Sequence, residues 1–430
     1  MLLTLEPLPA LEGDCLLLHW GTVANPKLAL IDGGPGNNYQ DSLRPRLEEI
    51  RQKRELARLL IDLVMVSHVD NDHVVGVKKF FKQLRHEVEN KTGAPLRHFA
   101  VARLWLNTFN DIIGDAVDRY YTALNASLEA SVDGAPNPDV IEKLHKAYAS
   151  KYPNDLDPDE EAYDIALVLA GHGEGRELRD SFGYLFDQHH ITALNAPFKK
   201  NGHSSLITLE TTPQPIKIDG LAFRILGPME AEIKALQKEF DSYIQDKGMG
   251  EASLLAAYAD RSIKNLSSIV CLTEMGGKRI LLTGDARGDK IVAGLTEAGL
   301  LDHGLFKVDV LKGPHHGSDR NVEPDFFEQI VADTYVFSGD GKHGNPERDT
   351  LTWLTDARGK HAEYDIVLTY PVDKIDLNRK AEAAKRHKPW KKVTDSLESF
   401  FDQRRREGFR FRVFAGAPVK IDLGDEKMPW

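Results

Sequence analysis

Short apolar runs alternate with turn residues along the first eighty positions of the chain. We expect strands at residues 15–20 and 28–31, and the second is followed by Asp-Gly-Gly-Pro-Gly, which continues neither a helix nor a strand. Apolar residues recur at helical spacing over residues 41–60. Residues 63–67 then form an apolar run that is typical of a buried strand. The pattern predicts a layered α/β opening.

The pattern changes between residues 111 and 202, where helical spacing replaces strand alternation. Residues 157–160, Asp-Pro-Asp-Glu, are typical of a helix start, with an Asp cap, an early proline and acid near the positive end of the helix dipole. A loop of this length without secondary structure is rare in a compact domain. We therefore expect a helical insertion.

Strand alternation returns in the second half of the chain. Residues 268–273 and 279–283 should form a hairpin across the turn Glu-Met-Gly-Gly. Further strands are expected at residues 205–211, 216–218, 222–226, 308–311 and 334–338.

Composition narrows the class of protein. The 430 residues are 41% hydrophobic and 28% charged, so a packed core is available and disorder is excluded. The net charge is −11, which disfavours phosphate backbones as partners of the whole surface. However, residues 374–412 carry thirteen Lys or Arg against six Asp or Glu, a local charge of +7. Any nucleic-acid contact should therefore be local.

The two cysteines, Cys15 and Cys271, exclude a disulfide framework and a cysteine-rich zinc finger. The first fourteen residues lack the basic start of a secretory signal, and no apolar run is long enough to span a membrane. We therefore expect a cytoplasmic protein without a membrane contact. The residues do not specify an oligomeric state.

The densest chemical signal is the segment His68-Val69-Asp70-Asn71-Asp72-His73. Its four metal-capable side chains follow an apolar strand and precede an apolar helix start, so they can converge on one point. Imidazole and carboxylate together suit zinc, manganese or iron rather than calcium. The alternative is a solvated polar loop, but such loops rarely concentrate two histidines and two aspartates in this way.

Two later strand ends strengthen the metal hypothesis. Asp285 ends the apolar run 280–284, and His315 and His316 follow the run 308–311. Each alone would be explained as a turn or loop residue. Together with the upstream segment they supply enough ligands for two metal ions that share a bridging carboxylate.

At these motifs the sequence resembles the metallo-β-lactamase fold, and within it the hydrolase domain of ComEC-type DNA-uptake proteins. The matching segments occur in the order of that family and cover the outer two thirds of the chain: residues 12–15, 30–34, 67–73, 281–285, 312–318 and, more weakly, 338–346. The resemblance implies an αββα sandwich of two mixed sheets between helices. Its core would be residues 1–110 and 203–371, with the helical insertion at 111–202 and a basic C-terminal extension at 372–430.

The resemblance also implies two divalent metal ions, zinc first and manganese as the alternative. The first ion would take His68, Asp70 and a third ligand. The second would take Asp72, His73 and either His315 or His316, and Asp285 would bridge the two.

The third ligand of the first site is the main departure from the family pattern. Relatives usually place a histidine before the hairpin, where this chain has Asn265, a weak neutral ligand. His203 is the alternative. The resemblance therefore implies a first site that is weakly occupied.

The remaining roles follow from the same resemblance. Asp72 would orient or deprotonate the attacking water, and whichever of His315 and His316 does not bind metal would contact the leaving group. Asp32 either orients a ligating histidine or is simply a turn residue. The residues expected to contact substrate are Ser318, His343 and Asn345.

The leading hypothesis is a metal-dependent phosphodiesterase that acts on nucleic acid. Phe400, Phe401, Phe409 and Phe411 interleave with arginines in the basic C-terminal region, and such side chains can stack bases and pair phosphates. For this segment taken alone, the favoured interpretation is an amphipathic helix and strand with Phe packed inward and Arg solvated. Other hypotheses are hydrolysis of a small ester, cyclic nucleotide or lactam, and a non-catalytic effector or scaffold whose insertion binds a protein partner.

Overall fold

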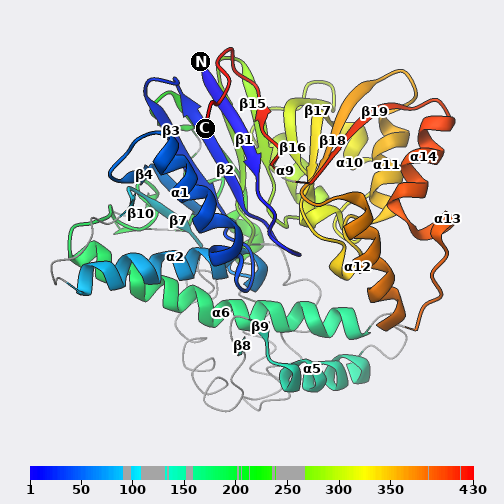
Figure 1. Ribbon diagram of the computed structural model, residues 1–430, viewed down its shortest axis with the longest axis horizontal. Coiled ribbons are helices and arrows are strands. Elements are labelled where there is room, and N and C mark those ends of the chain that lie inside the picture. Colours follow the sequence, from blue (N-terminus) through cyan, green and yellow to red (C-terminus); the bar gives the residue numbers. More distant parts are fainter. Residues whose placement is uncertain are drawn as a thin grey trace.

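The computed structural model shows four layers, in which two β-sheets lie face to face between two groups of helices (Figure 1). It describes all residues except 91–97, 108–130, 133–134, 152–157, 201–202, 205, 213, 235–237, 239–266, 386 and 417. The mixed α/β sandwich expected from the sequence is confirmed by these layers.

Within the described residues, the first sheet has six strands in the order β20-β1-β2-β3-β5-β7. They are β1 (Leu2–Pro7), β2 (Leu16–Gly21), β3 (Pro26–Ile31), β5 (Leu63–Val66), β7 (Leu104–Leu106) and β20 (Ile421–Asp422). Strands β1 to β3 pair antiparallel, and β5 and β7 continue parallel to β3. The three strands expected in this part of the sequence are confirmed to within two residues.

The second sheet has eight strands within the described residues, in the order β12 to β19. They are β12 (Ile216–Ile218), β13 (Leu221–Gly227), β14 (Val270–Met275), β15 (Lys278–Leu282), β16 (Phe306–Lys312), β17 (Ile330–Phe337), β18 (Glu363–Leu368) and β19 (Arg410–Ala415). Pairing is antiparallel from β12 to β15 and parallel from β15 to β19. The expected hairpin is therefore β14–β15.

The strand expected at residues 205–211 is wrong for its described part, residues 206–211. Asn107 uses its amide group to bind both backbone groups of Ile207, each at 2.8 Å. The hydroxyl of Thr211 donates to the carbonyl oxygen of Thr208 at 2.8 Å and closes a turn. Because these bonds satisfy the backbone, Ile207 is buried between the sheets without pairing to a strand.

Alternation along β2 shows how the layers are held. Leu16, Leu18 and Trp20 pack between the two sheets, whereas Leu17 faces the helices. Both faces of the strand therefore carry apolar side chains, with His19 buried against Glu6 at 3.2 Å, which explains the mostly hydrophobic run in the sequence.

Helices cover the outer face of each sheet. On the first sheet lie α1 (Arg44–Lys53) and α2 (Asn71–Glu89), with α6 (Pro158–Asp187) packed on α2 and α5 (Pro138–Lys151) on α6 (Figure 1). On the second lie α9 (Gly288–Glu297), α10 (Phe326–Gln329), α11 (Arg348–Arg358), α12 (Val372–Lys385) and α14 (Leu397–Arg406), the last preceded by α13 (Lys392–Asp395). In the described part of the chain, no helix is both long and apolar enough to cross a membrane.

Short strand pairs complete the described elements. They are β4 (Leu59–Ile61) with β6 (Phe99–Val101), β8 (Ser131–Val132) with β9 (Ala135–Pro136), and β10 (Lys199–Lys200) with β11 (His203–Ser204). The helix expected over 41–60 is too long, because α1 ends at Lys53 and β4 begins at Leu59.

Residues 372–430 are built into both sheets. Strand β19 pairs in parallel with β18 at the edge of the second sheet, and β20 pairs with β1 at the edge of the first. The segment therefore adds strands to the sandwich as well as the outer helices α12 and α14.

Candidate metal centre

Loops that follow strands of the two sheets meet between the sheets and carry most of the residues singled out from the sequence. From the first sheet come Asp32, after β3, and residues 67–73, after β5. From the second come Asp285, after β15, and His315 and His316, after β16. Contacts from His73 to Asp285 and from His316 to Asp72 join the two sets.

Close packing of glycines fixes the start of α2. Asp70 precedes this helix in an extended conformation, and His73 lies in its first turn. The amide of Gly33 donates to the carbonyl oxygen of His73 at 2.8 Å. A Cβ atom on Gly76 would lie 1.9 Å from the carbonyl oxygen of Gly33. Glycine at position 76 therefore allows His73 to sit directly against the turn that carries Asp32.

The paired histidines occupy an unusual backbone. They lie in the short 3-10 turn η2 (Pro314–Gly317), where His315 has a φ of 44° and His316 a φ of 55°. The left-handed region is uncommon for residues that carry a side chain, and it is found often at functional sites. The two rings are inclined by 72°, and the Nε2 atoms of both lie within 3.6 Å of Asp285 Oδ2.

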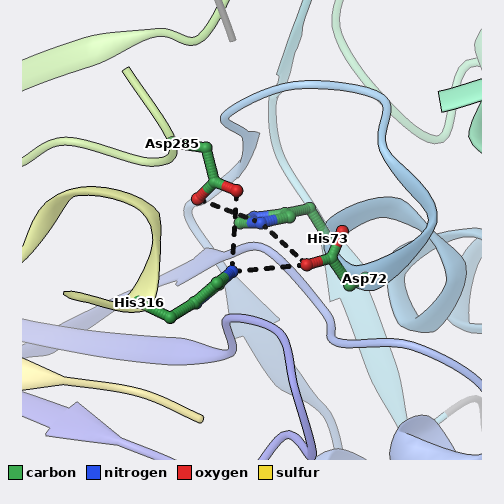
Figure 2. Close-up of side chains that lie close together, drawn as sticks. All are labelled: Asp72, His73, Asp285 and His316. Atoms are coloured by element: carbon green, nitrogen blue, oxygen red, sulfur yellow. Dashed lines mark ion pairs between the residues drawn. The ribbon is translucent and has the colours of Figure 1, made fainter. Parts of the chain in front are cut away.

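Four buried side chains form a compact cluster, drawn in Figure 2: Asp72, His73, Asp285 and His316. The Nε2 atom of His316 lies 3.3 Å from Asp72 Oδ2 and 3.6 Å from Asp285 Oδ2. The Nε2 atom of His73 lies 3.5 Å from Asp72 Oδ2 and 3.3 Å from Asp285 Oδ1. Nitrogen and oxygen ligands of one tetrahedral zinc ion would lie about 3.3 Å apart, given bonds of about 2.0–2.1 Å.

Key atoms of this cluster have no hydrogen-bond partner among the described residues. They are Nε2 of His73, Nε2 of His316 and Oδ1 of Asp285. The Nε2 atom of the neighbouring His68 also has no hydrogen-bond partner among these residues. Buried polar atoms are nearly always hydrogen-bonded. A divalent cation would satisfy several of these atoms at once, so the residues present fit a metal ion.

The acidic and basic groups of the cluster hold each other in the charged form. Burial alone would lower the pKa of His73, but Asp285, Asp72 and Asp32 outweigh it and hold this pKa well above its ordinary value. Burial alone would raise the pKa of Asp72, but His73 and His316 lower it to about 2. Protons and a metal ion therefore compete for the same imidazoles.

Asp32 holds His73 from behind. Its Oδ2 atom lies 3.0 Å from His73 Nδ1 and accepts a hydrogen bond from the Ser67 hydroxyl at 2.7 Å, while its Oδ1 atom accepts one from the Ser67 amide at 2.7 Å. A carboxylate in this position keeps the proton on Nδ1 and turns Nε2 toward the cluster. These contacts favour a role for Asp32 in orienting His73 over the alternative of a simple turn residue.

Asp14 holds His316 in the same way, and the sequence did not single it out for this role. Its Oδ1 atom lies 3.2 Å from His316 Nδ1 and also accepts from the Ser338 hydroxyl. Its Oδ2 atom lies 2.5 Å from Nζ of Lys312, which is fully buried. The sequence does contain one signal for this ion pair: Lys312 ends β16, a strand whose other residues are mostly apolar.

His68, Asp70 and His315 lie at the border of the compact cluster. His68 Nε2 is 3.4 Å from Asp70 Oδ2 and 3.8 Å from Asp285 Oδ2. His315 Nε2 is 3.5 Å from Asp285 Oδ2, and its Nδ1 is 2.7 Å from Asn321 Oδ1. The structure thus places His316 inside the cluster and His315 beside it.

The two residues considered as the third ligand of the first site cannot be placed. Asn265 and the side chain of His203 lie outside the described part of the structure.

The three residues expected to contact substrate lie outside the compact cluster. Ser318 is buried, and its hydroxyl accepts from the amide of Arg320 at 3.3 Å. Asn345 donates to the carbonyl oxygen of His315 at 3.4 Å, so it supports the histidine turn. His343 lies half-buried in the 3-10 turn η3 (Lys342–Gly344).

The aromatic residues of the basic C-terminal region are packed inward. Phe400, Phe401 and Phe411 are buried in the core of the second sheet, and half-buried Phe409 packs against it. The Arg404 guanidinium lies 4.9 Å from the ring centre of Phe409. The inward packing that the sequence favours for this segment is therefore confirmed, because α14 and β19 use these phenylalanines to cover the sheet.

Comparisons with known proteins add little to this geometry. No protein-family model and no curated protein sequence matches the chain. Among solved structures, the chain is similar to the metallo-beta-lactamase fold protein YhfI from Bacillus subtilis, with 8% identity over 98% of this chain and 100% of that one. The TM-score is 0.36, which is too low to establish a shared fold. The narrower resemblance to ComEC-type domains is not supported by these comparisons.

Proposed function

We propose that this chain is a metal-dependent hydrolase, and that it cleaves phosphodiesters in nucleic acid. The observation that supports a metal-dependent hydrolase is the buried cluster of two carboxylates and two imidazoles whose facing Nε2 atoms have no hydrogen-bond partner in the described part of the chain. The choice of phosphodiester and of nucleic acid rests on the likeness of residues 67–73, 281–285 and 312–318 to the ComEC-type pattern.

The cluster defines which residues would hold metal. Asp72, His73, Asp285 and His316 would hold one divalent ion, and His68 and Asp70 would hold a second that shares Asp285. The imidazole and carboxylate donor set suits zinc, with manganese as the alternative. When bound, such ions lower the pKa of water and stabilise negative charge on phosphate oxygens.

The protein's own groups would position the reaction. Asp14 and Asp32 hold the imidazoles of His316 and His73, so that both Nε2 atoms face the cluster. Asp72 contacts both imidazoles through Oδ2, and its other oxygen could orient the attacking water or accept its proton. Because His316 belongs to the cluster, contact with the leaving group falls to His315.

Cleavage assays test this proposal. Purified protein with added Zn²⁺ or Mn²⁺ is incubated with single- and double-stranded DNA and with RNA. Wild-type protein should cleave at least one of them, and Asp72→Ala and His73→Ala should lose at least about a hundredfold in rate, since both remove ligands. His303→Ala changes an exposed histidine and should cleave like wild type. Metal-loaded wild type that cleaves none of these substrates would refute the nuclease function.

A smaller substrate is the second candidate. Helix α6 passes over the metal-binding loop, and a Cβ atom on Gly175 would lie 3.1 Å from Val69. Such a cover could exclude a polymer and admit a small ester, cyclic nucleotide or lactam. Hydrolysis of bis-p-nitrophenyl phosphate, cyclic nucleotides or nitrocefin without cleavage of nucleic acid would favour this candidate.

A non-catalytic effector or scaffold is the third candidate, and metal content separates it from the other two. Fewer than one metal ion per chain after anaerobic purification would favour it.

A further inference from the structure

A cavity of about 330 Å³ lies beside the candidate metal centre, on the side of the C-terminal helices. It is lined by the loop that contains His343, the start of α11, the C-terminal half of α12, the loop before α13, and α13 itself. Its volume is at the lower end of the range for small-ligand pockets, so it suits one ring-sized group.

One loop separates this cavity from the metal ligands. The amide of Glu347, which lines the cavity, donates to the carbonyl oxygen of Gly317 at 2.9 Å, and Gly317 directly follows His316. Arg379, also in the lining, donates to the carbonyl oxygen of Pro346 at 2.7 Å. A molecule that spans this loop could therefore reach both the cavity and the metal centre.

The interior of the cavity offers both donors and acceptors. Arg379 is only 8% exposed, and its Nε atom has no hydrogen-bond partner among the described residues. The carboxylates of Glu347, Asp349, Glu382 and Asp395 also line the space. This balance disfavours a phosphate inside and suits a neutral ring with polar edges, such as a nucleobase.

The rim of the cavity carries the aromatic side chain of Trp390 within a lysine-rich segment. The described lysines of this segment are Lys385, Lys388, Lys391 and Lys392. Lys388 and Trp390 line the cavity, where Trp390 is half-buried and Lys388 is exposed. Aromatic side chains that stack bases beside cations that pair phosphates are the usual means of binding single strands.

We propose that this cavity binds an unpaired base of a single-stranded nucleic acid, stacked on Trp390, while Lys388 and Lys391 contact the flanking phosphates. The inference rests on the proposed action on nucleic acid. It assigns base stacking and phosphate contact to residues 388–391, because the phenylalanines of α14 and β19 are packed inward. Within this range it assigns the phosphate contacts to Lys388, which lines the cavity, and to Lys391, which directly follows Trp390 in the chain.

Binding without cleavage tests the inference. A fluorescein-labelled fifteen-nucleotide thymidine strand is titrated with the full chain in EDTA, and anisotropy gives the Kd. Trp390→Ala should weaken binding by about tenfold or more, the loss expected when a stacked base loses its aromatic partner. Trp390→Phe should stay within about threefold, because it keeps an aromatic face. Phe414→Ala, an exposed aromatic residue on β19, is the matched control and should bind like wild type.

The salt dependence tests the lysines separately. Lys388→Ala combined with Lys391→Ala should reduce the slope of log K against log salt concentration by about 1.4, because each single-strand phosphate contact contributes about 0.7 to that slope. Lys217→Ala combined with Lys307→Ala, two exposed lysines of the second sheet, should leave the slope unchanged.

Three results would overturn the inference: no binding by wild type, a Kd for Trp390→Ala within twofold of wild type, or the same dependence on Trp390 with duplex DNA. Since EDTA prevents cleavage, this outcome is independent of the nuclease assay.

Discussion

A buried lysine explains how so many carboxylates share one space. Lys312 is fully buried and pairs with Asp14. Four further carboxylates lie around the site among the residues that the structure describes: Asp32, Asp70, Asp72 and Asp285. Buried charge is costly unless it is compensated. Two divalent cations would balance these four carboxylates with every imidazole neutral, which agrees with the proposed occupancy.

We predict that Lys312→Met destabilises the protein strongly. Methionine keeps an unbranched side chain but removes the cation that faces Asp14 Oδ2, which should cost about 3–5 kcal/mol of unfolding free energy. Urea unfolding in EDTA, followed by circular dichroism, measures the loss. Adding Asp14→Asn should recover part of it, because the buried charge that Lys312 compensates is then gone.

Lys307→Met is the matched control for this prediction, since Lys307 is exposed on the same strand. It should change stability by less than about 0.5 kcal/mol. If Lys312→Met were as stable as this control, the charge balance described for the site would be incorrect.

At the scale of secondary-structure elements, the close approach of α2 to the turn after β3 positions His73. We predict that Gly76→Ala lowers the unfolding free energy by several kcal/mol, because its Cβ atom would overlap the carbonyl oxygen of Gly33. Gly183→Ala lies within α6, where a Cβ atom meets nothing within 4 Å, and should instead stabilise by about 0.5–1 kcal/mol. Denaturant midpoints compare the two, and equal midpoints would contradict the packing described here.

Element type, and the acidic and histidine residues that meet at the candidate site, could be predicted from sequence because they follow local patterns. The run at residues 63–67 and the polar residues after it are contiguous, so periodicity and ligand chemistry suffice. The pairing of Asp14 with Lys312 could not be predicted this way, because the two residues are 298 positions apart and meet only when the sheets pack. The inward packing of Phe400 and Phe411 likewise depends on β19 joining the second sheet.

The whole molecule is needed to form the candidate site. Asp72 and His73 lie at the start of α2, which follows β5 of the first sheet, whereas Asp285 and His316 follow strands of the second. A metal ion bound between them would link the two halves of the sandwich. Ligands that bind only the folded state raise its stability, so metal should raise the melting temperature of the whole chain.

The pH dependence of this stabilisation has a definite sign. In metal-free protein the pKa values of His73 and His316 lie well above the ordinary histidine value of about 6.5. Their stabilising effect is therefore present below that ordinary value and is lost as pH rises through the folded pKa. Metal binding requires neutral imidazoles and therefore strengthens as pH rises. We predict that the difference in melting temperature between zinc-loaded and EDTA-treated protein widens from pH 6 to pH 8. A difference that shrinks over this range would contradict the assignment.

The metal content of the protein tests the proposed metal centre most directly. Full-length wild type, loaded with Zn²⁺, is dialysed against metal-free buffer, and elemental analysis then counts zinc per chain. We predict between one and two zinc ions per chain in wild type, depending on occupancy of the first site. We predict about one zinc ion fewer in His316→Ala and no change in His303→Ala, whose histidine is exposed. Wild type with well under one ion per chain, or His316→Ala with the wild-type content, would contradict the proposed metal centre.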